Sequence, residues 1–222
     1  MPCIVISGQD FATPIQPGDV EIGNGTTNER DMPNNFYYDY SYSGTLLKAS
    51  QLSAIPNGAT INRIEWEYEI VTNGTYTINN VDMYMFQTPS SYTGFPSNTR
   101  VSGLSSTDTT WNNSITNYFQ TEYLTTIEFV KPSADPNIKW RGFNLTNSYN
   151  NFDNTKNLAI VFLNNDGVYQ PGTQSYPRVK GTFSSNNGRT CYFDEQDNTP
   201  YTLTDFVNIQ LSFFPNIRIY WS

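Results

Sequence analysis

The chain has 222 residues and a formal net charge of −8, because 12 Lys and Arg residues are outnumbered by 20 Asp and Glu residues. Aromatic residues reach 15% of the chain, which supplies ample apolar surface for a core. The basic residues are scattered, which excludes the clustered positive surface that nucleic acid or an anionic membrane requires. Histidine is absent, which excludes His-containing catalytic triads and zinc sites but leaves glycosidases that use two carboxylates.

The start of the chain predicts an arm instead of a targeting segment. Three prolines among residues 1–20 are typical of an N-terminal arm or edge strand, which leads into one β domain spanning residues 21–222. The first apolar run is short and has no basic residues before it, so no signal peptide is expected. No apolar stretch is long enough for a transmembrane helix. A retained initiator methionine on such a chain is typical of a virion protein that leaves the cell by lysis.

Apolar residues recur with a period of two along the chain, which predicts strands and no helices. Residues 64–70 alternate in this way and predict a half-buried strand. The Asn-Gly step at residues 73–74 then predicts a hairpin turn, with residues 75–86 as the return strand. Residues 158–163 form a continuous apolar run before an Asn-Asn-Asp-Gly turn, which predicts a strand covered on both faces.

The C-terminal third repeats this organisation. Residues 179–183 and 189–193 flank a Ser-, Asn- and Gly-rich turn and predict a second hairpin, and residues from 207 onward predict the last core strands. Residues 87–110 and 131–156 are rich in Ser, Thr, Asn, Pro and Gly and predict long polar loops. We therefore expect a single all-β domain, an antiparallel β-sandwich of roughly eight to ten strands.

Two early segments resemble the opening of a β-sandwich module that is common in secreted and surface proteins of Bacteroidetes. They are Glu-Ile-Gly-Asn-Gly-Thr-Thr at residues 21–27 and, within residues 32–43, a Pro-Asn-Asn-Phe-Tyr-Tyr step followed by Tyr-Ser-Tyr-Ser. Further segments resemble later landmarks of the module in the same order: residues 58–64, 80–85, 152–161 and 215–219.

This resemblance covers residues 21–221. It implies a jelly-roll-like sandwich of the kind found in adhesion or glycan-related surface proteins, without known catalysis. We expect the chain to differ from the module in having no export signal and no C-terminal sorting domain, and in a 20-residue N-terminal extension. These differences favour a virus of such bacteria that carries the module on its particle.

Tyrosines supply the best candidates for ligand contact. Tyr38, Tyr40 and Tyr42 share one side of a predicted strand, where they either face a glycan or protein partner or belong to the core. Tyr92 and Trp111 lie in the long polar loops and are candidates for exposed stacking platforms. We expect these five residues to form the contact surface, if the chain binds a glycan or another protein.

Carboxylates are the second set of candidates. Glu65, Glu67 and Glu69 share the polar side of their strand, and we expect a solvated face that discourages edge pairing. A subunit contact and a two-carboxylate glycosidase are the alternatives, because alternate strand residues lie about 6.5–7 Å apart.

We expect neither a metal site nor a disulfide bridge. Asp194, Glu195 and Asp197 form an acidic cluster after a predicted strand; a solvated turn is the first interpretation and a calcium site the alternative. Cys3 and Cys191 are too few for a disulfide scaffold, and we expect two free thiols in place of a bridge. No catalytic residue, metal or other cofactor is predicted.

The sequence thus predicts a non-catalytic structural or adhesion protein. The first hypothesis is a phage virion component exposed on the particle as a head decoration, fibre or tail accessory, which assembles through its sandwich and N-terminal arm. Its partners would be other virion or surface subunits, in a homo-oligomer or larger assembly, and host glycans, without nucleic acid or membrane insertion. The alternative is an extracellular carbohydrate-binding or adhesion module of a bacterial cell-surface protein. A glycan hydrolase is the third hypothesis.

Overall fold

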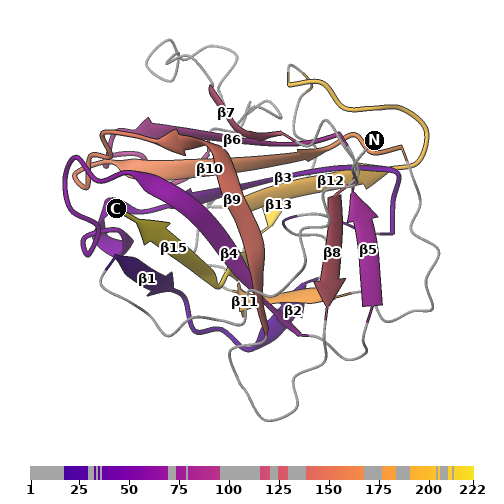
Figure 1. Cartoon of the computed structure of the whole chain (residues 1–222), viewed down its shortest axis with the longest axis horizontal. Helices are drawn as coiled ribbons and strands as arrows, with labels where there is room; N and C mark the ends of the chain where they lie inside the picture. The colour runs from indigo at the N-terminus through magenta and orange to yellow at the C-terminus, as the bar shows by residue number, and fades with distance from the viewer. Residues whose placement is uncertain are drawn as a thin grey trace.

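The computed structural model describes residues 18–29, 33, 35, 37–69, 74–78, 80–95, 116–120, 125–129, 139–167, 177–183, 191–203, 205, 210–211 and 213–222. They form two antiparallel sheets that pack face to face, with a smaller two-stranded ladder at one side (Figure 1). The all-β class and the β-sandwich architecture predicted from the sequence are therefore confirmed. The described part of the chain contains 15 strands, more than the eight to ten expected.

The first sheet has seven strands, with β4 at its centre. The order is β1 (Asp19–Ile22), β15 (Ile217–Trp221), β4 (Ile61–Glu69), β11 (Arg178–Phe183) and β14 (Phe213–Pro215), with β2 (Thr27–Glu29) paired to β11 and β9 (Trp140–Tyr149) paired to β4. All of these pairings are antiparallel. Of the predicted arm or edge strand, residues 1–17 lie outside the described residues, and Asp19 and Val20 begin β1 at the sheet edge.

The second sheet has six strands, with β3 and β10 at its centre. The order is β13 (Gln210–Leu211), β12 (Cys191–Gln196), β3 (Tyr40–Leu47), β10 (Asn157–Asn164), β6 (Val81–Thr88) and β7 (Thr116–Gln120). β5 (Gly74–Ile78) and β8 (Thr125–Phe129) form the separate ladder. The described residues include the 3-10 turn η1 (Ala49–Gln51), and no helix among them is long and apolar enough to cross a membrane.

The main core lies between the two large sheets. Trp66 of β4, Phe143 of β9 and Phe162 of β10 meet at its centre, with the Trp66 ring 6.3 Å from Phe143 and 6.2 Å from Phe162. Val81, Met83 and Met85 of β6 alternate into the same core, as their spacing predicts. Because successive strand residues point to opposite faces, the neighbours of these core residues face outward from the sandwich.

A second apolar cluster covers the outer face of the six-stranded sheet. Ala159, Val161 and Leu163 of β10 pack there against Phe95 and Tyr201, which belong to two connecting segments. Every residue of β10 is consequently buried. This confirms the prediction that the apolar run at residues 158–163 is covered on both faces.

Both predicted hairpins are wrong. β5 pairs with β8, while β6 belongs to the sheet opposite β4. In the same way, β11 lies in the first sheet and β12 in the second. A turn signal reports only local backbone preference, whereas the partner of a strand is chosen by burial of its apolar face, which either sheet of a sandwich satisfies.

The predicted loop over residues 131–156 is also wrong in part, because it contains the ten-residue strand β9. Beyond Trp140 and Gly142 its outward residues are polar, namely Asn144, Thr146 and Ser148, which gives the segment the composition of a loop. Phe143 and Leu145 nevertheless face the core, and this alternation is sufficient for a strand beside β4.

Candidate functional site

The outer face of β4 is buried and charged, in contrast to the solvated face expected for it. Glu65 is 2% exposed and Glu67 is 7% exposed, and Glu69 is partly buried. The sequence places three like charges on this face, but it does not reveal that neighbouring strands bring cations to them. This burial therefore corrects the prediction and identifies the β4 face as an unusual part of the molecule.

Strand pairing aligns the opposite charges in one row. Glu21 on β1 lies opposite Arg218 on β15, which in turn lies opposite Glu65 on β4. The Arg218 guanidinium is 1% exposed, donates to the Glu21 carboxylate through Nε at 3.1 Å and lies 3.5 Å from Glu65 Oε2 through Nη1. A charge buried in this way costs several kcal/mol of desolvation, which only close partners offset.

Further partners complete this charged row. Arg63 Nη2 lies 2.8 Å from Glu65 Oε1, and the Tyr220 hydroxyl donates to Glu65 Oε2 at 2.7 Å. The Trp140 ring lies over the Arg218 guanidinium, with 4.4 Å from Cζ to the ring centroid, a favourable cation–π geometry. Both oxygens of Glu65 are therefore occupied.

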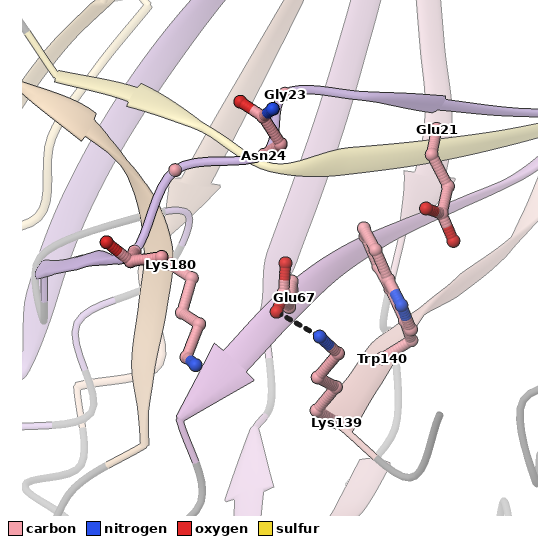
Figure 2. A pocket seen from close by; sticks show the side chains of 9 residues that line it. Glu21, Gly23, Asn24, Glu67, Lys139, Trp140 and Lys180 are labelled. Atoms are coloured by element: carbon pink, nitrogen blue, oxygen red, sulfur yellow. Dashed lines mark hydrogen bonds and ion pairs between the residues drawn. The ribbon is translucent and has the colours of Figure 1, made fainter. Parts of the chain in front are cut away.

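A pocket opens beside this row on the same outer face (Figure 2). It has a volume of about 360 Å³, at the lower end of the range of about 300–1,000 Å³ typical of ligand sites. Its lining consists of Glu21, Gly23, Asn24, Gly25, Thr26, Glu67, Lys139, Trp140 and Lys180. The pocket thus joins the β1–β2 connection to β4, to the start of β9 and to β11.

The β1–β2 connection is held against the sheet by one buried asparagine. Asn216 Nδ2 donates to Gly25 O at 2.8 Å, and Asn216 Oδ1 accepts from Gly25 N at 2.9 Å. Gly23 has a φ of +90°, and a Cβ on Gly25 would lie 2.0 Å from the Gly181 backbone. Both positions therefore require glycine, and the pocket rim has a defined backbone.

Glu67 forms the floor of the pocket, and both of its oxygens have donors. Lys139 Nζ lies 2.5 Å from Oε1, and Asn216 Nδ2 donates to Oε2 at 2.7 Å. Figure 2 shows the Lys139 ammonium directed at Glu67, with the Lys180 ammonium on the other side of this carboxylate. Asn216 therefore supports both the rim and the floor.

Three polar side chains of the lining have no such partner. Within the described residues, the Asn24 amide, the Thr26 hydroxyl and the Lys180 ammonium make no hydrogen bond or ion pair. The two carboxylates of the lining are, by contrast, compensated by Arg218 and Lys139. The pocket therefore offers one unpaired cation and two neutral hydrogen-bonding groups to a polar ligand.

The predicted tyrosine surface lies on the opposite outer face, where Tyr42 is buried and Tyr38, Tyr40 and Tyr92 are partly buried. Tyr42 is 1% exposed and packs edge-to-face on Tyr201, with ring centroids 4.6 Å apart. Tyr40 and Tyr92 pack at the margin of the same apolar cluster. Tyr38 precedes β3 and does not continue its alternation. The structure thus assigns Tyr42 to the core and leaves Tyr40 and Tyr92 partly accessible.

The segment that carries Tyr92 is fixed by hydrogen bonds. Lys48 Nζ donates to the carbonyl oxygens of Tyr92 and Thr93, and Asn157 Nδ2 donates to Tyr92 O at 2.9 Å. Burial lowers the pKa of the Lys48 ammonium. Trp111, the other predicted platform, lies outside the described residues.

The acidic cluster does not converge on one point. Asp194 and Glu195 are successive residues of β12 and point to opposite faces, with Glu195 accepting from Asn35 Nδ2 at 3.2 Å. Asp197 follows the strand and accepts from the Asp39 amide at 3.4 Å. Among the described residues, no three His, Cys, Asp or Glu side chains could hold a metal ion together.

Cys191 is buried on β12. Its Sγ lies 3.9 Å from Thr45 Oγ1 on the neighbouring strand β3. Its predicted counterpart, Cys3, lies outside the described residues.

Tyr84 on the tyrosine-rich face provides a pH-dependent prediction. Burial, together with the Asp82 carboxylate that accepts from its hydroxyl at 3.3 Å, raises the pKa of Tyr84 to about 12. The protonated phenol is therefore favoured by folding, so its stabilising contribution is complete below the ordinary pKa of about 10 and is lost between there and about 12. We expect the free energy of unfolding of the unmodified chain to fall relative to that of Tyr84→Phe between pH 10 and 12.

Urea unfolding of both proteins at pH 8, 10 and 11 tests this expectation. Asp82→Asn is the control, since it should bring the pKa of Tyr84 closer to 10 and reduce the difference. Parallel stability curves for the unmodified chain and Tyr84→Phe over this pH range would contradict the prediction.

Sequence reasoning missed most of the pocket. Glu21, Lys139, Lys180 and Asn216 are isolated polar residues in the sequence, far apart along the chain. A signal was available in the segments at residues 21–27 and 215–219, both noted for their resemblance to a module, which the β1–β15 pairing brings together at this pocket. Comparison with protein-family models, curated proteins and solved structures finds no match to this chain.

Proposed function

We propose that this chain is a non-catalytic adhesion and structural protein that binds a glycan in the pocket on the outer face of β4. The observation that carries the proposal is a set of three polar side chains at the pocket that make no hydrogen bond or ion pair within the described residues: Asn24, Thr26 and Lys180. Sugars are recognised through several hydroxyl groups, each of which needs a donor or acceptor on the protein. A pocket with a fixed backbone and unsatisfied polar groups suits this kind of ligand.

The lining argues for binding over hydrolysis. A glycosidase needs one carboxyl group that donates a proton to the leaving group and a second that acts as base or nucleophile. Glu67 is instead held by Lys139 and Asn216, and Glu21 is held by Arg218. Both carboxylates are therefore engaged in ion pairs with cations of the protein.

The setting that we propose is the surface of a phage particle, with a bacterial cell surface as the alternative. A β-sandwich with a pocket on an outer face can display that pocket while its edges contact other subunits. Immunogold electron microscopy of the native source, with antibody raised against this chain, separates the two settings. Gold on particles supports the virion assignment, and gold confined to cell envelopes would overturn it.

A glycan array followed by titration calorimetry tests the binding proposal. In the double variant Asn24→Ala/Thr26→Ala, we expect at least a tenfold loss of affinity for the best glycan. Both side chains are exposed, and neither makes a hydrogen bond within the described residues, so the melting temperature should change little.

Tyr92→Ala and Trp111→Ala serve as the matched controls, because these aromatic residues represent the competing contact surface. Unchanged glycan affinity in both controls supports the pocket. Loss of affinity in either control, with full affinity in the double variant, would move the site away from it. Release of reducing sugar ends from a bound oligosaccharide would contradict the non-catalytic assignment.

A further inference from the structure

We infer that the pocket is specific for a sugar that carries a carboxylate, and that the Lys180 ammonium binds this carboxylate. The inference rests on the proposed glycan-binding function and adds the chemical class of the ligand. It comes from the distribution of charge around the pocket, from the attachment of Lys180 to the sheet and from the neutral character of the remaining free groups.

Within the described residues, each carboxylate of the pocket and its adjoining row has a cation partner, whereas the Lys180 ammonium has no carboxylate partner. Three carboxylates, those of Glu21, Glu65 and Glu67, are buried there or line the pocket. Three cations contact them within 4 Å: Arg63, Lys139 and Arg218. Lys180 is a fourth cation, so the pocket and its adjoining row together have one cation more than carboxylates, on a chain whose formal net charge is −8.

The carboxylate on the pocket floor does not compete for this ammonium. Both oxygens of Glu67 already accept hydrogen bonds, from Lys139 and from Asn216. Figure 2 shows the Lys180 side chain extending toward the pocket without a contact to the other residues drawn. The ammonium is therefore available to an anionic group of a ligand.

The backbone that carries Lys180 is firmly placed. Its neighbour Val179 is buried in the main core, and the backbone N–H of Asn216 donates to the backbone carbonyl oxygen of Lys180 at 2.8 Å. Lys180 also lies opposite Asn28 in the β11–β2 pairing. A side chain on a rigid strand presents its charge at a defined position, which reduces the entropy lost when a ligand binds.

The chemistry of the free groups favours a singly charged carboxylate on an otherwise polar sugar. One lysine presents a point charge, without the planar fork of an arginine, and the guanidinium nearest to the pocket, that of Arg218, is occupied by Glu21 and Glu65. The Asn24 amide and the Thr26 hydroxyl suit neutral hydroxyl groups. Uronic acids and sialic acids both combine a carboxylate with such hydroxyl groups.

Calorimetric titration with paired probes tests the inference. Glucuronic acid is compared with glucose, and oligosaccharides ending in N-acetylneuraminic acid are compared with the same oligosaccharides without it. For the acidic sugar that binds, we expect Lys180→Gln to reduce affinity at least tenfold and Lys180→Arg to retain most of it. Lys156→Gln is the matched control, since this exposed lysine pairs with Asp153 and does not line the pocket. The affinity of this variant for the acidic sugar should equal that of the unmodified chain.

The titrations distinguish glucuronic acid from N-acetylneuraminic acid as the ligand. They also distinguish failure of the carboxylate specificity from failure of glycan binding as such. Preference for glucuronic acid or for the sialylated probe, lost in Lys180→Gln, supports the inference and identifies the source of the carboxylate. Equal affinity for acidic and neutral sugars would overturn the inference and leave the glycan-binding function standing. Undiminished acidic-sugar binding in Lys180→Gln would also overturn it, and no binding to any sugar would overturn both.

Discussion

Replacing Arg218 by methionine is expected to lower the free energy of unfolding by about 3–5 kcal/mol. Arg218 is fully buried between Glu21 and Glu65 and lies under the Trp140 ring. Methionine fills much of the same space, but it leaves Glu65 inside the protein with one cation fewer. The cost comes mainly from the weaker compensation of this buried charge, which keeps only Arg63 and the Tyr220 hydroxyl as partners, since the apolar packing is largely kept.

Urea unfolding of three variants isolates this effect. The double variant Arg218→Met/Glu65→Leu removes both charges and is expected to recover a large part of the loss, because apolar replacement of a complete buried ion pair is often close to neutral. Lys156→Met breaks an exposed ion pair with Asp153 and should cost less than about 1 kcal/mol. Equal destabilisation by Arg218→Met and Lys156→Met would show that the buried row contributes no more than a surface pair.

Replacing Asn216 by alanine is expected to destabilise the protein and to weaken ligand binding together. The change leaves Gly25 N and Gly25 O without their partner and removes a donor from the buried Glu67 carboxylate. Each buried polar group left without a partner costs about 1–3 kcal/mol. Because Asn216 holds both the rim and the floor of the pocket, glycan affinity should fall even though Asn216 does not line it.

Unfolding and calorimetry of the same Asn216→Ala sample measure both effects. The matched control is Asn150→Ala, which removes one exposed hydrogen bond, that to Thr60 at 3.1 Å, and should change stability by less than about 0.5 kcal/mol. Full glycan affinity in a folded Asn216→Ala protein would show that the rim held by Asn216 is not needed for binding, and would contradict the role of Asn216 in shaping the pocket.

The class of fold was accessible to sequence reasoning because strand alternation is a local property. Ile64, Trp66 and Tyr68 face the core as their period-two spacing predicts. The apolar run at residues 158–163 also predicted a strand buried on both sides, because a strand without a polar face needs cover on each. Neither conclusion depends on knowing which strand lies beside which.

The positions that depend on strand partners were predicted poorly. The Asn-Gly step at residues 73–74 favours a tight turn, yet β5 and β6 that follow it belong to different sheets. Residues 140–149 resemble a loop in composition, and their strand forms beside β4 because Phe143 and Leu145 reach the core there. Local signals contain no information on which of two sheets offers the better place for an apolar face.

The amino-acid sequence by itself determined the all-β class, the alternation of the core strands and the acidic balance of the chain, because these follow from residue type and near spacing. The tertiary structure alone decided that Glu65 and Glu67 are buried among cations and that the Lys180 ammonium beside them makes no ion pair in the part of the chain that the structure describes. The cations come from β4, from Lys139 just before β9 and from β15, and Tyr220, which donates to Glu65 in the same row, lies 155 positions away from it along the chain. Only strand pairing brings these charged side chains close together in space, and their spacing sets the charge that the pocket presents to a ligand.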